Sequence, residues 1–138
     1  MRRLYLLIAM LSIYLRWAHA ADFLDPSVAF RPAMRFVGKD VAELKFYIAE
    51  GYYLYRDKIS ISPVDARIRL LPPQFEHGKL KDDENFGKVE VYYKETLIIL
   101  RYTNSDAATP IGFRVVAQGC AEAGLCYPPE TYYLPARR

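Results

Sequence analysis

Hydrophobic and polar residues alternate along most of the chain after Phe36. In the stretch AELKFYI, residues 42–48, every second side chain is apolar and those between are charged or tyrosine. A period of two is typical of a β-strand with one buried face. Similar stretches recur further along the chain: YYLYRDKISIS, with an irregularity expected at residues 56–58, and then ARIRLL, KVEVYY, TLIILRYT, GFRVVAQ and TYYL.

The spacing of these strands predicts the fold class. Strands at intervals of roughly 8–12 residues, separated by glycine and proline, favour an antiparallel β-sandwich or barrel. The segment HGKLKDDENFGK, residues 77–88, interrupts the alternation with polar and acidic residues, which favours a solvated loop holding one aromatic, Phe86. We find no helical period, internal repeat or linker, and therefore expect one all-β domain.

The first twenty residues have the layout of an export signal. MRRLYLLIAMLSIYLRWAHA begins with two arginines, continues with an apolar run and ends in small residues, and the run is short for a membrane span. We expect cleavage after Ala20, with residues 21–138 as the mature domain; the alternative is a retained N-terminal anchor, because Arg16 and Trp17 interrupt the run. Loss of three arginines lowers the 19 basic side chains to 16, equal to the 16 acidic ones. A neutral domain gives no reason to expect a nucleic-acid partner.

The two cysteines of the chain lie in QGCAEAGLCYPPET, residues 118–131, with five residues between Cys120 and Cys126. In an exported protein a single pair is expected to form a disulfide for at least part of the time. A short loop makes a weak structural cross-link, since closing about seven residues contributes roughly 2.4 kcal/mol, against roughly 4.3 kcal/mol for about sixty. Gly119 and Gly124 permit the sharp turn that a short bridge requires. Two interpretations stay open at this point, a redox-active pair and an ordinary short disulfide.

Other cysteine chemistry fits less well. Zinc-binding thiolates follow a different spacing, and His77 is the only histidine after residue 20, so we expect no metal and no cofactor. The chain also has no C-x-x-C sequence and no βαβ pattern that would indicate a thioredoxin fold.

The cysteine segment resembles the motif of the N-terminal periplasmic domain of DsbD, a family of thiol:disulfide interchange proteins, whose pattern is close to Q-G-C-A-x-A-G-x-C-Y-P-P-E-T. Two further blocks support the resemblance in the expected order, EGYYLYRDKISIS at residues 50–62 and DENFGKVEVYY at residues 83–93. The resemblance extends from about Asp25 to Leu134. It implies an immunoglobulin-like β-sandwich in the periplasm that carries electrons as a dithiol.

The resemblance also implies roles for individual residues. Cys126 is expected to form the mixed disulfide with a partner protein, and Cys120 is expected to resolve it. Tyr53 and Tyr55 are similar to aromatic neighbours of the pair. A cap loop over the pair corresponds to Asp83, Glu84, Asn85, Phe86 and Gly87.

This chain departs from the family pattern near the pair. Asn85 stands where the family often has its capping aromatic, so Phe86 is the substitute candidate for that role, and Leu125 replaces a common phenylalanine. Glu122 lies between the two cysteines. If the acidic residues of the cap loop approach as well, every charge near the pair is negative, which disfavours a thiolate.

The implied partners are oxidised thioredoxin-like periplasmic proteins of the disulfide isomerase and cytochrome c maturation types. The electron donor would be a thioredoxin-like or membrane protein, and in the family such domains belong to the same polypeptide. Since the sequence holds neither, we expect a separate or truncated N-terminal module or one part of a larger protein. The alternative function is a non-catalytic secreted β-sandwich that binds a partner and carries a local structural disulfide.

Overall fold

The computed structural model of the chain describes residues 22–135. The predicted export signal, residues 1–20, lies outside the described residues, and its cleavage stays a prediction. The elements are a short helix, α2 (Pro26–Ala29), a 3-10 turn, η2 (Arg56–Lys58), and the strands β1 (Phe30–Gly38), β2 (Val41–Ile48), β3 (Tyr52–Tyr55), β4 (Ser60–Pro63), β5 (Ile68–Leu70), β6 (Gln74–Phe75), β7 (Lys79–Asp83), β8 (Gly87–Tyr92), β9 (Glu95–Asn104), β10 (Phe113–Ala117), β11 (Gly119–Ala121) and β12 (Glu130–Leu134). Within the described range no helix has the length and apolar character needed to cross a membrane.

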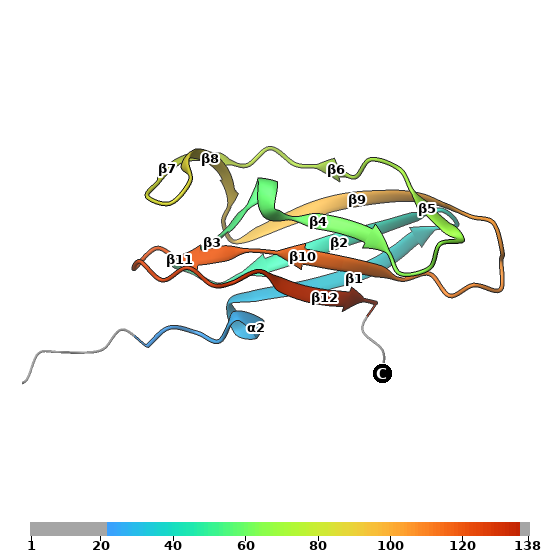
Figure 1. Cartoon of the computed structure of the whole chain (residues 1–138), viewed down its shortest axis with the longest axis horizontal. Helices are drawn as coiled ribbons and strands as arrows, with labels where there is room; N and C mark the ends of the chain where they lie inside the picture. The colour runs from blue at the N-terminus through green and yellow to red at the C-terminus, as the bar shows by residue number, and fades with distance from the viewer. Residues whose placement is uncertain (1–21, 136–138) are drawn as a thin grey trace, which may run out of the picture.

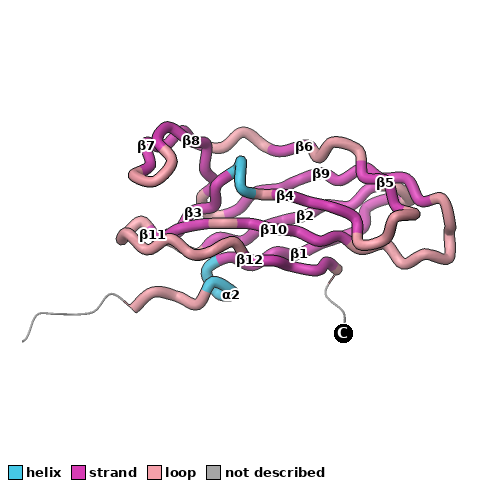
Figure 2. Tube along the Cα trace, viewed as in Figure 1, coloured by secondary structure: helices cyan, strands magenta, loops and turns pink. Residues whose placement is uncertain are grey.

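The strands pair in antiparallel sheets that form a two-layered sandwich (Figures 1 and 2). One layer has the strand order β1-β2-β9-β5, with β6 also paired to β9. The facing layer has the order β12-β10-β4, and at one end it continues into a smaller sheet with the order β11-β3-β8-β7. Only Gln118 separates β10 from β11, and its carbonyl accepts the backbone N–H of Tyr55 at 3.0 Å. The predicted all-β, immunoglobulin-like sandwich is confirmed.

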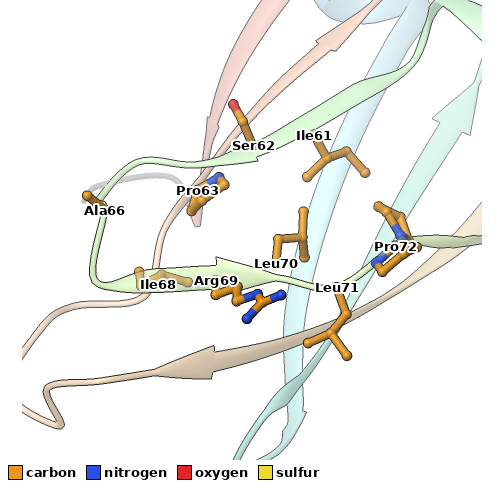
Figure 3. Close-up of a pocket in the computed structure, with 10 residues that line it drawn as sticks. Ile61, Ser62, Pro63, Ala66, Ile68, Arg69, Leu70, Leu71 and Pro72 are labelled. Carbon is orange, nitrogen blue, oxygen red and sulfur yellow. The ribbon is translucent and has the colours of Figure 1, made fainter.

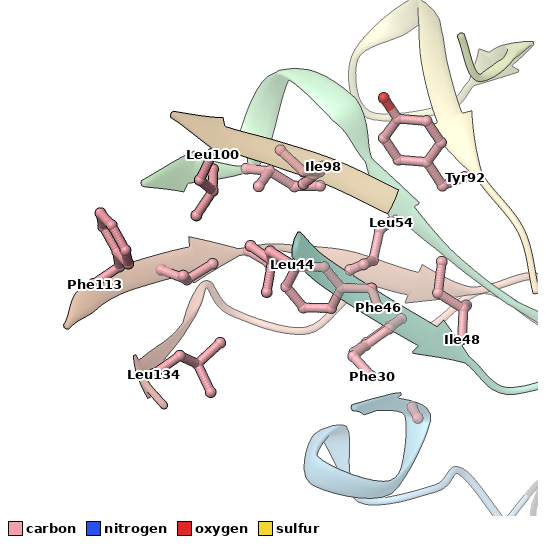
Figure 4. Close-up of a cluster of buried hydrophobic side chains, with 14 of the residues drawn as sticks. Phe30, Leu44, Phe46, Ile48, Leu54, Tyr92, Ile98, Leu100, Phe113 and Leu134 are labelled. Atoms are coloured by element: carbon pink, nitrogen blue, oxygen red, sulfur yellow. The ribbon is translucent and has the colours of Figure 1, made fainter. Parts of the chain in front are cut away.

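The main hydrophobic core lies between the two layers (Figure 4). In β2 every second side chain from Ala42 to Ile48 is buried, as the alternation predicts. Antiparallel pairing places Leu44 opposite Ile98 of β9, and Phe113 of β10 enters the same core from the facing layer. Burial of each large apolar side chain of this kind contributes about 1.5–3 kcal/mol relative to an exposed one. The core therefore stabilises the scaffold on which the cysteine segment is mounted.

β1 was not predicted by the alternation. Its sequence, FRPAMRFVG, mixes proline, arginine and apolar residues, and only Phe30 is fully buried while Pro32 and Met34 are half-buried. β1 is the outer strand of its layer and pairs with β2 alone. Pro32 weakens the local signal for a strand, because proline cannot donate a ladder hydrogen bond and is found mainly in edge strands such as this one.

The predicted alternation fails in β3, where all four residues are buried. Tyr52 and Leu54 belong to the main core. The opposite face of β3 is covered by a second, smaller cluster, which contains Tyr53, Tyr55, Val91 and Cys120. β3 does not return along β2, because its partners are β8 and β11. The irregularity expected at residues 56–58 is the turn η2, which takes the chain from the small sheet into β4.

The solvated loop predicted at residues 77–88 is wrong, since most of this segment belongs to the β-hairpin of β7 and β8. The two strands pair from Lys79 and Val91 to Asp83 and Gly87, and residues 84–86 form the turn. The polar composition is compatible with a strand because β7 is the edge of the small sheet. In Figure 1 this hairpin projects at the same end of the sandwich as β11 and the loop that follows it.

Candidate functional site

The two cysteines form a disulfide at the end of the sandwich. Cys120 is the middle residue of β11 and pairs with Tyr53 of β3, while Cys126 follows a tight turn and forms a single β-bridge back to Cys120. The bond Cys120–Cys126 joins residues whose Cα atoms are 4.0 Å apart. The predicted bridge at one end of an all-β domain is confirmed.

Backbone contacts explain the glycines of this segment. Gly124 has φ 110°, a conformation that L-residues rarely adopt. Gly119 lies so close to β3 and β1 that a Cβ atom there would sit 2.4 Å from the Tyr53 carbonyl oxygen and 2.5 Å from the Phe30 ring. Gly124 therefore allows the turn, and Gly119 allows β11 to pack against the sheet.

The two cysteines differ in their access to solvent. Cys120 has no exposed surface, whereas Cys126 is exposed. A protein that reaches this end of the domain can therefore contact Cys126 and cannot contact Cys120 directly. The geometry agrees with the roles that the resemblance implies for the attacked and the resolving cysteine.

A buried hydrogen-bond network connects Cys120 to Asp83. The Tyr55 hydroxyl lies 3.1 Å from Cys120 Sγ and donates to Asp83 Oδ2 at 2.8 Å. The Tyr53 hydroxyl donates to the same oxygen at 2.8 Å. Once the disulfide is reduced, the Cys120 S–H can donate to the Tyr55 oxygen, because that hydroxyl's own proton is directed to Asp83. The network thus offers the buried sulfur a hydrogen-bond acceptor once the disulfide is reduced.

The same network shifts the pKa values of its members. Burial raises the pKa of Asp83, but the hydrogen bonds from Tyr55, Tyr53 and the backbone N–H groups of residues 85 and 86 outweigh it, so the net pKa lies below the ordinary value. Burial is also the main cause of the raised pKa of Tyr55. At neutral pH the arrangement is therefore a carboxylate that accepts hydrogen bonds from two neutral tyrosines.

The hairpin turn reaches the disulfide with two neighbouring side chains. The Asn85 side-chain amide, Nδ2, donates to Cys126 Sγ at 3.3 Å. The Phe86 ring packs edge-on against Tyr55, with 5.1 Å between ring centroids, and Lys58 Nζ lies 4.5 Å from the centre of the Phe86 ring. Gly87, with φ 70°, closes the turn. The polar side chain is thus the one that contacts the exposed cysteine, and the aromatic one contacts the tyrosine behind it.

Charges of both signs lie beside the pair, which contradicts the expectation that all of them are negative. Lys81 Nζ forms an ion pair with Glu122 Oε2 at 3.1 Å, and the Tyr93 hydroxyl donates to Glu122 Oε1 at 2.7 Å. The hydrogen bond from Tyr93 is the main cause of the lowered pKa of Glu122, and burial raises the pKa of Tyr93 to about 12. These contacts tie β7 to the cysteine loop.

Lys81 and Tyr93 were not predicted as site residues. Lys81 precedes Asp83 by two positions, which places both on one face of a strand, so reading residues 79–83 as β7 would have grouped them. The remaining predicted residues, Glu84 and Leu125, are exposed at the rim of the site. Among residues 22–135 no group of three or more His, Cys, Asp or Glu side chains is arranged to hold a metal ion.

One hollow on the described surface is not lined by residues of this site. It is an open groove of about 640 Å³ on β4, β5 and the prolines after β5, lined by residues such as Ile61, Leu70 and Pro72 (Figure 3). Its lining residues include neither cysteine and no residue of the hairpin turn. The chemistry of the chain is therefore on a protruding loop and hairpin, which suits a protein partner better than a small molecule held in a pocket.

Comparisons with known proteins agree with the geometry. The family model for "Thiol:disulfide interchange protein DsbD, N-terminal" matches residues 20–136. The chain is 38% identical over 124 residues to the DsbD of Ralstonia nicotianae, which is 90% of this chain and 20% of that protein. It spans about one fifth of the length of such curated relatives.

Two solved structures are also similar. The reduced N-terminal domain of Neisseria meningitidis DsbD has a TM-score of 0.74 and 37% identity, and the match covers 85% of this chain and 91% of that one. The complex between the DsbD N-terminal and PilB N-terminal domains from the same organism gives a TM-score of 0.69 and 38% identity over 83% of this chain and 87% of that one. On these matches, the chain belongs to the family of the N-terminal domain of the thiol:disulfide interchange protein DsbD.

Proposed function

We propose that this domain is an exported thiol–disulfide exchange module of the periplasm, which accepts electrons from a dithiol donor and passes them to oxidised thioredoxin-like proteins. The observation that carries the proposal is the disulfide with one exposed and one buried cysteine at the end of a rigid sandwich. The similar domain of Neisseria meningitidis forms a complex with another protein domain, which supports protein partners.

Reduction of this domain by the donor proceeds through the exposed Cys126. A donor thiolate attacks the exposed Cys126 Sγ, the S–S bond breaks, and its electron pair moves to Cys120 Sγ, which takes a proton. The donor's second thiolate then attacks the donor sulfur of the mixed disulfide, which releases Cys126 as a thiolate and leaves the donor oxidised. Two electrons have then passed from the donor to this chain.

Transfer to the acceptor runs through the same exposed sulfur. The Cys126 thiolate attacks one sulfur of the acceptor's disulfide, the acceptor's S–S bond breaks, and the other acceptor sulfur leaves as a thiolate, so that a new mixed disulfide forms. Cys120 then loses its proton and attacks Cys126 Sγ, which restores the internal bond and releases the second acceptor sulfur, so that the acceptor takes up protons and becomes a dithiol. Because Cys120 lies behind Cys126 and beside Tyr55, it is close enough to resolve the intermediate but is covered against direct attack.

The acceptors are expected to be of the disulfide isomerase and cytochrome c maturation types, and the donor a thioredoxin-like or membrane protein. Export itself is tested by the mass of the mature protein, which should begin at residue 21 when the full chain is secreted. A mature protein that retains residues 1–20 would favour the anchor instead.

Single-cysteine variants test the exchange. Cys120→Ala leaves the exposed thiol, so it should trap a mixed disulfide with an oxidised thioredoxin-like protein, seen as a band that disappears on reduction. Cys126→Ala leaves only the buried thiol and should trap little. Equal trapping by the two variants would contradict the assignment of roles. A reduction potential below about −300 mV, typical of structural disulfides, would favour the non-catalytic alternative.

A further inference from the structure

Asn85 occupies a position at which a donor can act on the reacting sulfur. Its side-chain Nδ2 points at Cys126 Sγ from 3.3 Å. Its backbone N–H donates to Asp83 Oδ1 at 2.9 Å, and that carboxylate is itself held by Tyr53 and Tyr55. A buried network therefore holds the backbone of Asn85 at the position from which its side chain reaches Cys126.

The backbone does not explain why asparagine stands there. Asparagine is often selected because it tolerates a left-handed backbone, but among the described residues Lys94 is the only non-glycine residue with positive φ. Gly87 supplies the left-handed residue of this turn. The turn can therefore be built with other residues at position 85, and the side-chain contact with the sulfur is the feature that needs an explanation.

The chemistry of the contact changes during exchange. In the disulfide, Cys126 Sγ is a neutral and weak acceptor. When the mixed disulfide with the donor is resolved, Cys126 leaves as a thiolate and the N–H···S contact becomes charge-assisted, which roughly doubles the strength of a hydrogen bond. A donor already in place where negative charge develops needs no reorganisation.

We propose that the Asn85 amide stabilises the Cys126 thiolate, so that the hairpin turn promotes exchange at the sulfur it covers. The proposal rests on the exchange function proposed above and adds a residue that acts on the reacting atom. It separates two tasks within one turn: Phe86 packs on Tyr55, and Asn85 acts on Cys126.

The test uses the Cys120→Ala chain, in which Cys126 is the single thiol. Alkylation by iodoacetamide is followed by mass spectrometry across pH, because the many tyrosines obscure thiolate absorbance at high pH. The plateau rate at high pH reports how well the turn covers the sulfur. The pH midpoint of the rate reports how well the thiolate is stabilised. Loss of cover alone hydrates the thiolate and lowers the midpoint, which is opposite to the rise expected when a hydrogen-bond donor is lost.

Asn85→Leu removes the donor without adding charge, and we expect the midpoint to rise by about one pH unit, which corresponds to a tenfold smaller thiolate fraction below the midpoint. Exchange with a disulfide at neutral pH should slow by only about threefold, because the more basic thiolate is also more nucleophilic and this offsets part of the smaller thiolate fraction. Asn85→Asp places an acceptor and a negative charge at the sulfur and should raise the midpoint further. Asn85→Gln keeps the amide and should give a midpoint between those of the parent and Asn85→Leu.

Glu84→Gln is the matched control, since Glu84 is the exposed neighbour in the same turn. Removal of its negative charge should leave the midpoint unchanged or lower it slightly. A midpoint for Asn85→Leu equal to that of the parent, or an equal rise for Glu84→Gln, overturns the role of Asn85. If the Cys120→Ala parent traps a thioredoxin-like protein but Asn85→Leu leaves the midpoint unmoved, this inference alone is refuted. If Asn85→Leu moves the midpoint but the parent traps no thioredoxin-like protein, the exchange function is refuted.

Discussion

The main core and the disulfide end of this domain are stabilised in different ways, although they share strand β3. The core side of β3 packs Tyr52 and Leu54 among aliphatic and aromatic side chains. The opposite side places Tyr53 and Tyr55 against a sulfur and a carboxylate. Packing of the first kind has little directional preference, while the second depends on hydrogen bonds of defined geometry.

The comparison teaches how one strand can support both stability and chemistry. The core side resists change because removal of a large side chain leaves a cavity. The disulfide side depends on a few polar contacts that hold the cysteines, the hairpin turn and the tyrosines together. Substitutions should therefore affect stability most in the core and reactivity most at the disulfide end.

The largest expected effect on stability is in the core. Phe46→Ala removes a fully buried ring that packs edge-on against Tyr132, and we expect a loss of about 3–5 kcal/mol in the free energy of unfolding. Urea unfolding of the oxidised protein measures it. Tyr47→Ala, on the exposed face of the same strand, should cost less than about 1 kcal/mol. A Phe46→Ala variant no less stable than Tyr47→Ala would contradict the location of the core.

Asp83→Asn should have a smaller but pH-dependent effect. The buried carboxylate accepts hydrogen bonds from Tyr53 and Tyr55, and we expect a loss of about 1–3 kcal/mol at neutral pH. Because the folded-state pKa of Asp83 lies below its ordinary value of 3.8, its contribution is complete above that value and is lost as the pH falls through the folded-state pKa.

Urea unfolding of the wild type and Asp83→Asn at several pH values between about 6 and 2 measures this effect. The stability difference between the two proteins should shrink below about pH 4. Asp82→Asn changes an exposed neighbour and should stay within about 0.5 kcal/mol of the wild type at neutral pH. A difference that grows on acidification would show that Asp83 is not held as a carboxylate.

Phe86→Ala should affect reactivity more than stability. The ring is 44% exposed and packs on Tyr55, so its loss should cost at most about 1 kcal/mol and leave the melting temperature nearly unchanged. The reduced protein should nevertheless be oxidised several-fold faster by small-molecule disulfides, because the turn covers the pair less well. Leu80→Ala is a control on the same hairpin with a side chain that is 76% exposed. A loss of several degrees with unchanged thiol reactivity would make Phe86 a structural anchor.

The smallest effect is expected at the ion pair between Lys81 and Glu122. Both side chains are partly exposed, so the coupling free energy from a double-mutant cycle with Lys81→Gln and Glu122→Gln should be about 0.2–1 kcal/mol. Salt at about 1 M should remove most of it. A coupling that persists at high salt would indicate that the contact between β7 and the cysteine loop is stronger than a surface ion pair.

The strands with one solvent-facing side could be predicted from local pattern. In β2, β5 and β10, more buried residues alternate with half-buried or exposed ones, as their sequences predict, because successive side chains of a strand point to opposite faces of the sheet. The cysteine pair was equally visible, since its two members lie on one short loop. Resemblance to a known family added the order of the blocks around that loop.

The sequence alone determined an all-β sandwich and a disulfide between neighbouring cysteines, while the tertiary structure decided what surrounds that disulfide. Tyr55 is 65 residues from Cys120 and Asn85 is 41 residues from Cys126 along the chain. These contacts depend on how the small sheet continues the larger one and on where the β7–β8 hairpin folds. The alternation of apolar and polar residues cannot predict these contacts, because it indicates whether a face is buried and not which distant segment covers that face.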